Sequence, residues 1–397
     1  MKGLTYMDKQ FLSEAIKYKM IMLILFSSIF LTGCWDRREV FDMAIVLGTA
    51  IDKTDDGQIE VSIQVLIPQS IGGSSESGGQ GGNKEIVMVK NGKGKTISDA
   101  TSNLEMQLSR NIFWGHCKMY IFSENFAKEN GIRKELEYLI RHPKPRERAY
   151  LYIAKGLAKD MLEVTPDLEL YVGEGMRRLV EKQIVVKKTI KDVEEMLTSD
   201  TKSIILPYMY IEKSEKGEAS IVITEASIFN RDKMVGVINN DAMRGVLWLR
   251  NEVKINSITV PLKEREYISV RVTSGKTSLK PKIINGNWRM DINVQIKCEV
   301  TQNGTNLNVF DPKIVATLEE ELEKATRKKI EGALQAVQQD LKVDVIGFGE
   351  VFHRKYPKDW KQAESDWEYY FSNIKTKTKV KATVLRSGLT TSSSSLK

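Results

Sequence analysis

The sequence is poor in the residues that most often hold metals or disulfides. Its three cysteines are too few and too scattered for a disulfide framework. No two of its three histidines stand at helical ligand spacing, and the pair His116-Cys117 has nothing nearby to complete a tetrahedral metal site. We therefore expect no metal and no cofactor. The residues concerned are Cys34, Cys117, Cys298, His116, His142 and His353.

Motifs for nucleotide binding and catalysis are also missing. Gly94-Lys95-Thr96 resembles the end of a phosphate-binding loop, but the glycine required five positions earlier is replaced by Val89. The pair Gly173-x-Gly175 is followed by Arg178 where the dinucleotide fingerprint needs glycine. No Ser/His/Asp arrangement stands out, although carboxylates are too plentiful for spacing alone to exclude a carboxylate enzyme. We expect no catalytic residues and no enzyme.

Long hydrophobic runs are absent, and the one short run lies near the amino terminus. Residues 20–31 form a 12-residue apolar run, interrupted only by Ser27 and Ser28, that follows a basic segment. As a helix they reach about 18 Å, which is less than the hydrocarbon core of a bilayer. They are typical of the apolar region of a signal peptide. The residues that follow, Leu31-Thr-Gly-Cys34, have the form of a bacterial lipobox.

The lipobox predicts that the mature chain begins at a lipidated Cys34. Small residues before the cysteine let a peptidase bind the extended chain closely, and a thiolate readily takes a diacylglyceryl group as a thioether. Two acyl chains give stable anchoring, whereas one is marginal. We expect a signal peptide over residues 1–33, translation from Met1, Met7 or later, and an extracytoplasmic mature protein. The other interpretation is an uncleaved short anchor with a chance cysteine behind it.

Charge and composition are those of a folded globular chain with a basic surface. Apolar residues make up 41% and charged residues 28%, and the net charge is +8. Residues 1–33 contribute +2, which leaves +6 for the mature chain. This balance weakly favours anionic headgroups or an acidic partner. A basic loop at residues 141–148 lacks the aromatic platforms expected of a nucleic-acid site, so we expect no nucleic acid.

The first part of the mature chain alternates strand and helix patterns. Strands are predicted at 42–52 and 59–67 around a turn at 55–57, and then at 84–90, 118–122 and 149–154. Helices are predicted at 96–110, 126–140, 168–182 and 190–197, the first of them opened by Thr96. Residues 72–82 are too rich in glycine and serine to pack.

The second part is predicted to combine hairpins with one long helix. Strands at 221–229 and 234–238 flank a turn, and Asn285-Gly286 is a strong hairpin signal. The arm that follows alternates apolar and polar residues and places Cys298 on its apolar face, where a buried thiol is favoured over a reactive one. Asp311-Pro312 opens a helix whose apolar stripe continues to Leu341 and favours packing on a sheet over a partner's groove.

A final strand over residues 375–384 carries a row of lysines on one face. The row consists of Lys375, Lys377, Lys379 and Lys381. Such a row usually guards an edge strand or faces solvent, and a contact with lipid headgroups is the alternative.

These patterns predict a multidomain α+β protein, with two to three mixed α/β domains, antiparallel sheets and a long C-terminal helix packed on a sheet. We expect domains over residues 34–205 and 206–390 after the signal peptide. The second is expected to contain two subdomains, the last at about 305–390, and a disordered tail over 391–397.

Several motifs of the mature chain resemble the C-subunit lipoproteins of spore germinant receptors, the Ger(x)C family. They are Cys34-Trp-Asp-Arg-Arg-Glu39, Ala44–Asp52, Gly94–Ile97, Leu206-Pro207, Gly245–Leu249, Asp344-Val-Ile-Gly-Phe-Gly349, Tyr356-Pro-x-x-Trp360 and Trp367. The resemblance covers essentially all of residues 34–390, and several of its motifs carry tryptophan.

The resemblance implies a non-enzymatic receptor subunit needed for nutrient-triggered germination. It implies a position on the outer surface of the spore inner membrane, beside two multi-spanning membrane subunits, A and B, with the nutrient bound by those partners. A scaffold role, in which the folded domains dock on external loops of those subunits, fits this picture. A lipid-anchored solute-binding protein and an extracytoplasmic hydrolase are the alternatives.

Overall fold

The structure is a computed structural model that describes residue 14 and residues 17–23, 42–67, 86–141, 147–253, 256–263 and 265–386. The chain divides into two compact units, Met1–Met43 and Ala44–Lys397, and each is described by itself. In the first unit residues 17–23 are helical. Cys34, the glycine-rich stretch at 72–82, residues 142–146 and the tail at 391–397 lie outside the described residues. In the described ranges, no helix combines the length and the apolarity that crossing a bilayer requires.

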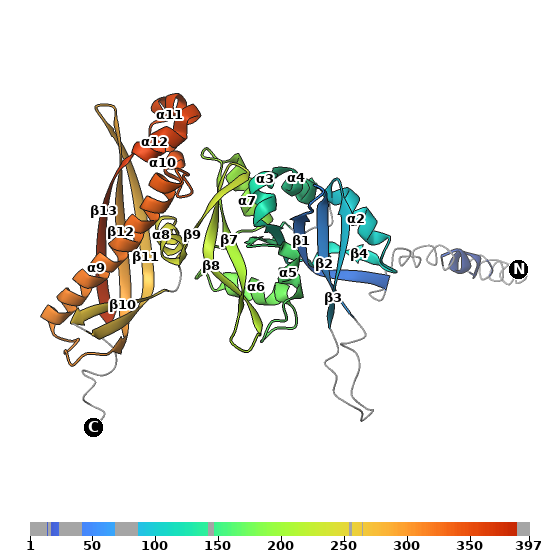
Figure 1. Cartoon of the computed structure of the whole chain (residues 1–397), viewed down its shortest axis with the longest axis horizontal. Coiled ribbons are helices and arrows are strands. Elements are labelled where there is room, and N and C mark those ends of the chain that lie inside the picture. Colours follow the sequence, from blue (N-terminus) through green and yellow to red (C-terminus); the bar gives the residue numbers. More distant parts are fainter. Residues whose placement is uncertain are drawn as a thin grey trace, which may run out of the picture. The chain divides into compact units, whose positions relative to one another are not determined.

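The larger sheet of the second unit has nine strands, with parallel pairing at its centre (Figure 1). Its order is β3 (Val87–Gly94), β2 (Ile59–Leu66), β1 (Met43–Lys53), β5 (Met119–Ser123), β6 (Tyr150–Ala154), β7 (Ser203–Lys213), β8 (Ala219–Asn230) and β9 (Lys233–Ile238), with β4 (Asn111–Phe113) beside β1. β1, β5, β6 and β7 pair in parallel. Every residue of β5 and β6 is buried, as expected where helices cover both faces.

Helices cover the two faces of this sheet and form two cores. One core contains side chains from α2 (Ile97–Glu105), α3 (Glu124–Glu129), α4 (Arg133–Arg141) and α7 (Ile190–Thr198). The other contains side chains from α5 (Ala158–Glu163) and α6 (Val172–Glu181) and continues into the second sheet through α8 (Asn240–Leu249).

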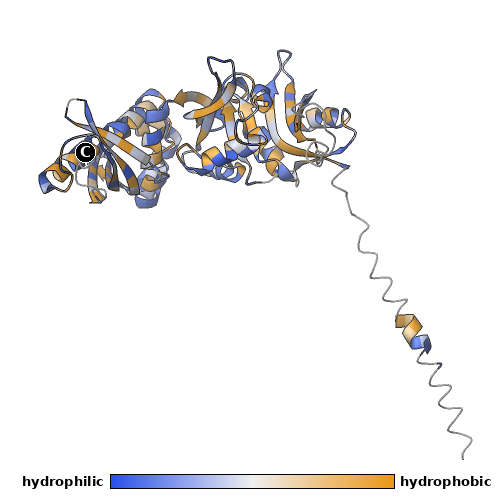
Figure 2. Ribbon diagram, turned by 90° about the horizontal axis from the view of Figure 1, so that it is seen from below, coloured by the Kyte–Doolittle hydropathy of each residue, from blue (hydrophilic) through white to orange (hydrophobic). Residues whose placement is uncertain are grey.

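The second sheet has the order β10 (Asn256–Lys263), β11 (Glu266–Ile284), β12 (Asn287–Asn303), β13 (Lys375–Arg386). The first three strands are antiparallel, and β13 pairs with β12 in parallel. α9 (Pro312–Leu334) lies along this sheet and continues as a π-helical turn over Gln335–Asp340 (Figure 1). Figure 2 shows hydrophobic and hydrophilic residues alternating along the strands.

Three short helices close the end of the second sheet. They are α10 (Phe348–Lys355), α11 (Pro357–Ala363) and α12 (Trp367–Asn373). Their aromatic side chains gather on one residue of β12, Trp288, whose ring centroid lies 4.5 Å from that of Phe352 and 5.9 Å from that of Trp367. Aromatic pairs at these separations add stability beyond the area that they bury. The Tyr-Pro-x-x-Trp segment and Trp367 therefore belong to this core.

The predicted fold class and several local predictions are confirmed. The long helix begins after Asp311, whose side chain caps it, and packs on a sheet. Asn285 and Gly286 form the two-residue turn between β11 and β12, with φ of 50° and 77°. Cys298 is buried in the second sheet. The parallel centre of the first sheet and the parallel pairing of β13 were not predicted.

Some helices were predicted with the wrong extent. The single helix expected at 126–140 is two helices, α3 and α4, interrupted at residues 130–132, where Gly131 has a φ of 75°. The helix expected at 168–182 starts at Val172. The segments α5, α8, α10, α11 and α12 were not predicted as helices. Residues 206–238 contribute β8 and β9 to the first sheet, and the division at residue 205 stays a prediction.

Candidate functional site: a polar pocket beside Asp344

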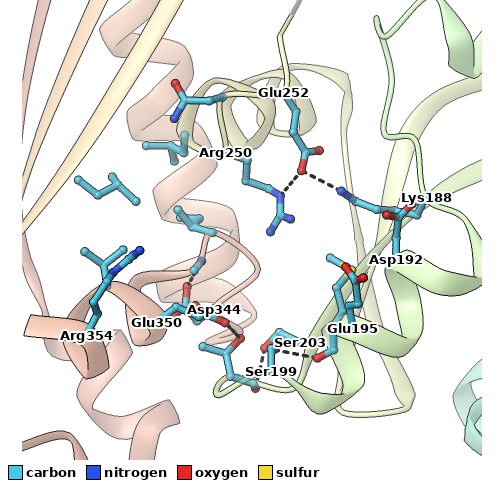
Figure 3. A pocket seen from close by; sticks show the side chains of 18 residues that line it. Lys188, Asp192, Glu195, Ser199, Ser203, Arg250, Glu252, Asp344, Glu350 and Arg354 are labelled. Atoms are coloured by element: carbon cyan, nitrogen blue, oxygen red, sulfur yellow. Dashed lines mark hydrogen bonds and ion pairs between the residues drawn. The ribbon is translucent and has the colours of Figure 1, made fainter. Parts of the chain in front are cut away.

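A polar pocket of about 510 Å³ opens between three groups of residues from distant parts of the chain (Figure 3). α7, the turn after it and the start of β7 contribute Asp192, Glu195, Ser199 and Ser203. The residues that follow α8 contribute Arg250 and Glu252. The loop before α10 and α10 itself contribute Asp344, Glu350 and Arg354. The pocket is therefore assembled only when both sheets are in place.

A triangle of charges forms one wall of the pocket. Lys188 Nζ and Arg250 Nε both donate to Glu252 Oε1, each over 2.8 Å (Figure 3). Burial opposes the charge of Glu252, but Arg250 and Lys188 outweigh it and hold the pKa of Glu252 below its ordinary value. Burial lowers the pKa of Lys188, which has one anionic partner and a second cation close by. Arg250 Nη1 also donates to the carbonyl oxygen of Val345 over 2.5 Å.

Asp344 is buried beneath the pocket and is held by four donors. Its Oδ1 accepts hydrogen bonds from the N–H groups of Gly347 (2.9 Å) and Phe348 (3.0 Å). Its Oδ2 accepts from the N–H of Gly349 (2.7 Å) and from Trp367 Nε1 (3.1 Å). The carboxylate thereby satisfies the first N–H groups of α10, which need partners from outside the helix. Gly347 is left-handed, with a φ of 94°, a conformation that favours glycine.

A second carboxylate influences Asp344. Burial, together with the charge of Glu350, raises the pKa of Asp344 to about 6, and the backbone donors oppose this shift. Glu350 Oε1 accepts from Thr201 Oγ1 over 3.1 Å, while Glu350 Oε2 is buried without a hydrogen-bond partner among the described residues. This side of the pocket is therefore electronegative, and the side formed by Arg250 and Lys188 is electropositive.

The arrangement fits binding and positioning better than covalent chemistry. Ser199 Oγ donates to the carbonyl oxygen of Met196 and Ser203 Oγ to that of Thr201, so these hydroxyls are engaged with the backbone. His353 Nδ1 lies 2.7 Å from Asp200 Oδ2, and its ring stacks on Trp360. In the part of the chain that is described, no group of three or more metal-ligating side chains is placed to hold an ion.

Motifs singled out in the sequence have structural roles. Cys117 is buried and its thiol donates to the carbonyl oxygen of Met119, whereas its neighbour His116 is exposed. Burial raises the pKa of both Cys117 and Cys298 to about 11, which leaves little thiolate at neutral pH. Thr96 caps α2 by accepting from the N–H of Asp99, and a side chain at Gly94 would collide with the backbone of Ala100.

Sequence patterns alone did not identify the charge triangle. Arg250 and Glu252 are two residues apart, but Lys188 lies more than 60 residues before them, and no spacing rule connects it to the pair. The segment Asp344–Gly349 stood out only as part of a resemblance. Cys34, the predicted lipidation residue, lies outside the described residues.

Two family models match the chain in succession. The model described as "Spore germination protein N-terminal domain" matches residues 36–211, and the model described as "Spore germination B3/ GerAC like, C-terminal" matches residues 224–388. The gap between the two matches, residues 212–223, covers the end of β7, the turn after it and the first part of β8, within the first sheet.

Individual relatives match over nearly their full length. Spore germination protein KC of Bacillus subtilis (strain 168) is 28% identical over 395 residues, which cover 94% of this chain and 96% of that protein. Spore germination protein B3 of the same organism is 24% identical and covers 95% of this chain and 99% of that protein. The crystal structure of the GerBC protein superimposes with a TM-score of 0.58 at 20% identity, over 85% of this chain and 97% of that one, and shows the same fold.

Proposed function

The chain belongs to the spore germination B3/GerAC-like family, and on this premise we propose that it is a non-enzymatic lipoprotein subunit of a spore germinant receptor. In this role it acts in nutrient-triggered germination with two membrane subunits, A and B. The observation that carries the proposal is the extent of the two family matches, which together run from residue 36 to residue 388. The similarity to the family therefore extends over nearly the whole folded chain and is not confined to one domain.

The proposed anchor is a diacylglyceryl group on Cys34. It is supported by the apolar run at residues 20–31 and by the lipobox that ends in this cysteine. The folded unit starts at Ala44, so only a short tether separates the lipid from the first sheet. We place the protein on the outer surface of the spore inner membrane, where it docks on external loops of the membrane subunits and stabilises the complex.

The absence of a catalytic role is part of the proposal. The polar groups of the pocket beside Asp344 form hydrogen bonds mainly with one another and with the backbone. Four donors hold Asp344, and Glu252 accepts from two cations. Groups engaged in this way build a rigid junction, which is what a scaffold needs. Nutrient recognition is then left to the partner subunits.

Deleting the gene tests the proposed role. We expect dipicolinate release to fall when the spores receive a panel of nutrients, and to stay normal when they receive non-nutrient triggers. The membrane subunits should also decline, because the scaffold that stabilises them is gone. Normal nutrient germination with normal levels of both membrane subunits would show that the scaffold proposal is wrong.

Replacing the anchoring residue separates attachment from folding. Cys34→Ala should leave the domains folded and impair nutrient germination, since the chain loses the lipid that holds it firmly at the bilayer. Thr32→Ser, which keeps a small residue before the cysteine, is the matched control and should behave as wild type. Full nutrient response in the Cys34→Ala spores would mean that contacts other than the lipid hold the protein in place.

The alternative is a lipid-anchored solute-binding protein, and the open polar pocket of about 510 Å³ is the feature that favours it. That function predicts measurable affinity of the isolated chain from residue 35 for one of the nutrients. The subunit proposal predicts little or none. Calorimetric titration against the nutrient panel, with Arg354→Gln and Glu195→Gln as pocket variants, distinguishes the two.

A further inference from the structure

The strand register collects basic side chains on one face of the second sheet. In β12 and β13, Arg289 stands opposite Lys375, and Gln295 opposite Lys381. In β11 and β12, Lys276 stands opposite Gln295. Side chains that alternate along paired strands share a face, so three strands contribute to one surface. We call it the lysine face, and its members are Lys276, Lys280, Lys282, Arg289, Lys297, Lys375, Lys377, Lys379 and Lys381.

The lysine face is open to solvent. All eight of its lysines are exposed and Arg289 is half-buried. On the opposite face of β13, Val380 and Ala382 are buried and Val384 is half-buried. That opposite face carries the apolar core shared with α8 and α9. The helices of this part of the chain therefore leave the lysine face uncovered.

The face is also poor in compensating acids. Asp291 pairs with Lys282 over 2.7 Å and with Arg289 over 2.8 Å. Among the described residues, no carboxylate pairs with the other seven lysines of the face. Four lysines of β13 alone stand about 6.6 Å apart along the strand, because every second residue of a strand faces the same way. They form a row about 20 Å long.

The free edge of β13, beside this row, is blocked by side chains of α9. The N–H groups of Ala382 and Val384 donate to Glu323 Oε1 (3.1 Å) and Glu319 Oε1 (2.9 Å) of α9. Another strand cannot pair with these groups while the glutamates hold them. What remains available is the face itself, through its charge.

An open array of lysines on one face of a sheet fits a lipid surface better than a protein or a nucleic acid. Lysine is depleted in the cores of protein interfaces, where aromatic anchors and arginine dominate. Single-stranded nucleic acid requires stacking platforms, and the exposed Tyr267 belongs to the far end of β11. Anionic headgroups require only a diffuse positive potential, and each lysine near such a surface strengthens binding about fivefold.

We propose that the lysine face lies against anionic phospholipid headgroups and forms a second, electrostatic attachment of the chain to its membrane. This inference rests on the membrane attachment proposed above. A lipid anchor leaves a chain free to rotate about its tether. A second contact removes that freedom, and it lays the second sheet on the bilayer. One acylated residue and one basic surface are a known sufficient combination for firm membrane association.

The test uses the chain from residue 35, which contains the whole compact unit and no lipid. Sedimentation with vesicles of phosphatidylcholine and about 30% phosphatidylglycerol is compared with sedimentation with phosphatidylcholine alone, at low and high salt. The variant replaces Lys375, Lys377, Lys379 and Lys381 with glutamine. The control replaces four exposed lysines of the larger-sheet region with glutamine and has the same net charge. They are Lys93, Lys134, Lys213 and Lys216.

We expect wild type to bind the anionic vesicles only, and high salt to release it. The lysine-face variant should bind at least tenfold more weakly, and the control should stay within about twofold of wild type. Equal losses in both variants, or no preference of wild type for anionic vesicles, would overturn the proposal. So would a lysine-face variant that binds vesicles normally and fails to co-purify with the membrane subunits, because the face would then bind a protein. The receptor role is tested separately by gene deletion.

Discussion

At the scale of single residues, Asp344 illustrates how a buried charge is retained in this fold. A carboxylate without water is costly unless donors surround it. Here three backbone N–H groups and one indole N–H supply the bonds. Removing the side chain would leave these four donors buried without an acceptor, and each such donor costs about 1–3 kcal/mol. The residue thus orders the loop before α10.

The raised pKa of Asp344 predicts a specific dependence of stability on pH. The folded pKa, about 6, lies above the ordinary value of 3.8, so the folded state holds the proton more tightly than the unfolded state. The resulting stabilisation is present below about pH 4 and is lost as pH rises through 6. It amounts to about 3 kcal/mol.

Urea unfolding of wild type and Asp344→Asn between pH 4 and 7 measures this contribution. The Asp344→Asn protein should be less stable than wild type at every pH, because the amide NH2 group cannot accept hydrogen bonds from the backbone N–H groups. Its stability should not depend on pH through this residue, because asparagine does not titrate. Wild type should lose stability relative to the variant as pH rises. Glu350→Gln should reduce that loss, because its charge contributes to the shift. Parallel curves for wild type and Asp344→Asn would contradict the assignment.

At the scale of elements, α9 protects the edge of the second sheet. Glu319 and Glu323 occupy successive turns of the helix and accept from alternate N–H groups of β13. An unprotected edge is a template for pairing with another chain. The sequence suggested that the lysine row guards this edge. The structure assigns part of that task to two glutamates.

Replacing both glutamates should expose the edge. Glu319→Ala with Glu323→Ala leaves two N–H groups of β13 without acceptors, and we expect concentration-dependent association in size-exclusion chromatography. The double variant Glu320→Ala and Glu331→Ala is the control. It removes the same two negative charges, but neither residue accepts a hydrogen bond from β13. If the first variant stays monomeric at concentrations where wild type does, the edge is blocked by other means.

The charge triangle joins elements that are distant in sequence. Lys188 precedes α7, and Arg250 and Glu252 follow α8. Removing one partner of a buried ion pair leaves the other charge buried without a counter-charge. This lowers the free energy of unfolding by roughly 3 kcal/mol. Lys188→Met and Glu252→Gln should each destabilise strongly, and the double variant should lose about 1–2 kcal/mol less than their sum.

Urea unfolding of the two single variants and the double variant gives this coupling. The exposed pair Lys191 and Glu195, 4.0 Å apart on α7, is the control and should be additive. Additive losses at Lys188 and Glu252 would mean that the pair does not stabilise the junction.

Local signals predicted much of this fold, and tertiary contacts decided the rest. Asn285-Gly286, Thr96 and Asp311-Pro312 act within a few residues, so their turn and caps could be predicted. Pro207 lies inside β7, although proline usually argues against a strand, and so β7 was not predicted. The helices α10 to α12 were missed because aromatic packing on Trp288 stabilises them. The pocket was missed because only the assembled fold brings its charges together.

At the scale of the whole molecule, the two proposed attachments differ in their response to salt. Acyl chains are held by apolar burial, which salt does not screen. Lysine contacts weaken within a Debye length that shrinks as salt rises. The lipid and the lysine face therefore predict distinct behaviour in isolated membranes.

Washing isolated membranes with salt tests whether the lipid and the lysine face respond differently to ionic strength. Wild type and the four-lysine glutamine variant should both stay bound in 1 M salt, because the lipid holds them. Cys34→Ala protein should be retained at low salt and released at high salt. The combined variant should be in the soluble fraction under both conditions. Retention of the combined variant at low salt would show that docking on the membrane subunits is enough to hold the chain without the lipid and the lysine face.

The parallel pairing of β13 with β12 also affects how the chain is made. On its β13 side, Arg289 of β12 can pair only with Lys375, which is synthesised 86 residues later. At the usual pace of translation this takes roughly 4 to 17 seconds. During that interval the long β12 has one side without a neighbour. A ribosome that stops before residue 375 releases a chain with a permanently open strand, so we expect such products to be cleared or to aggregate.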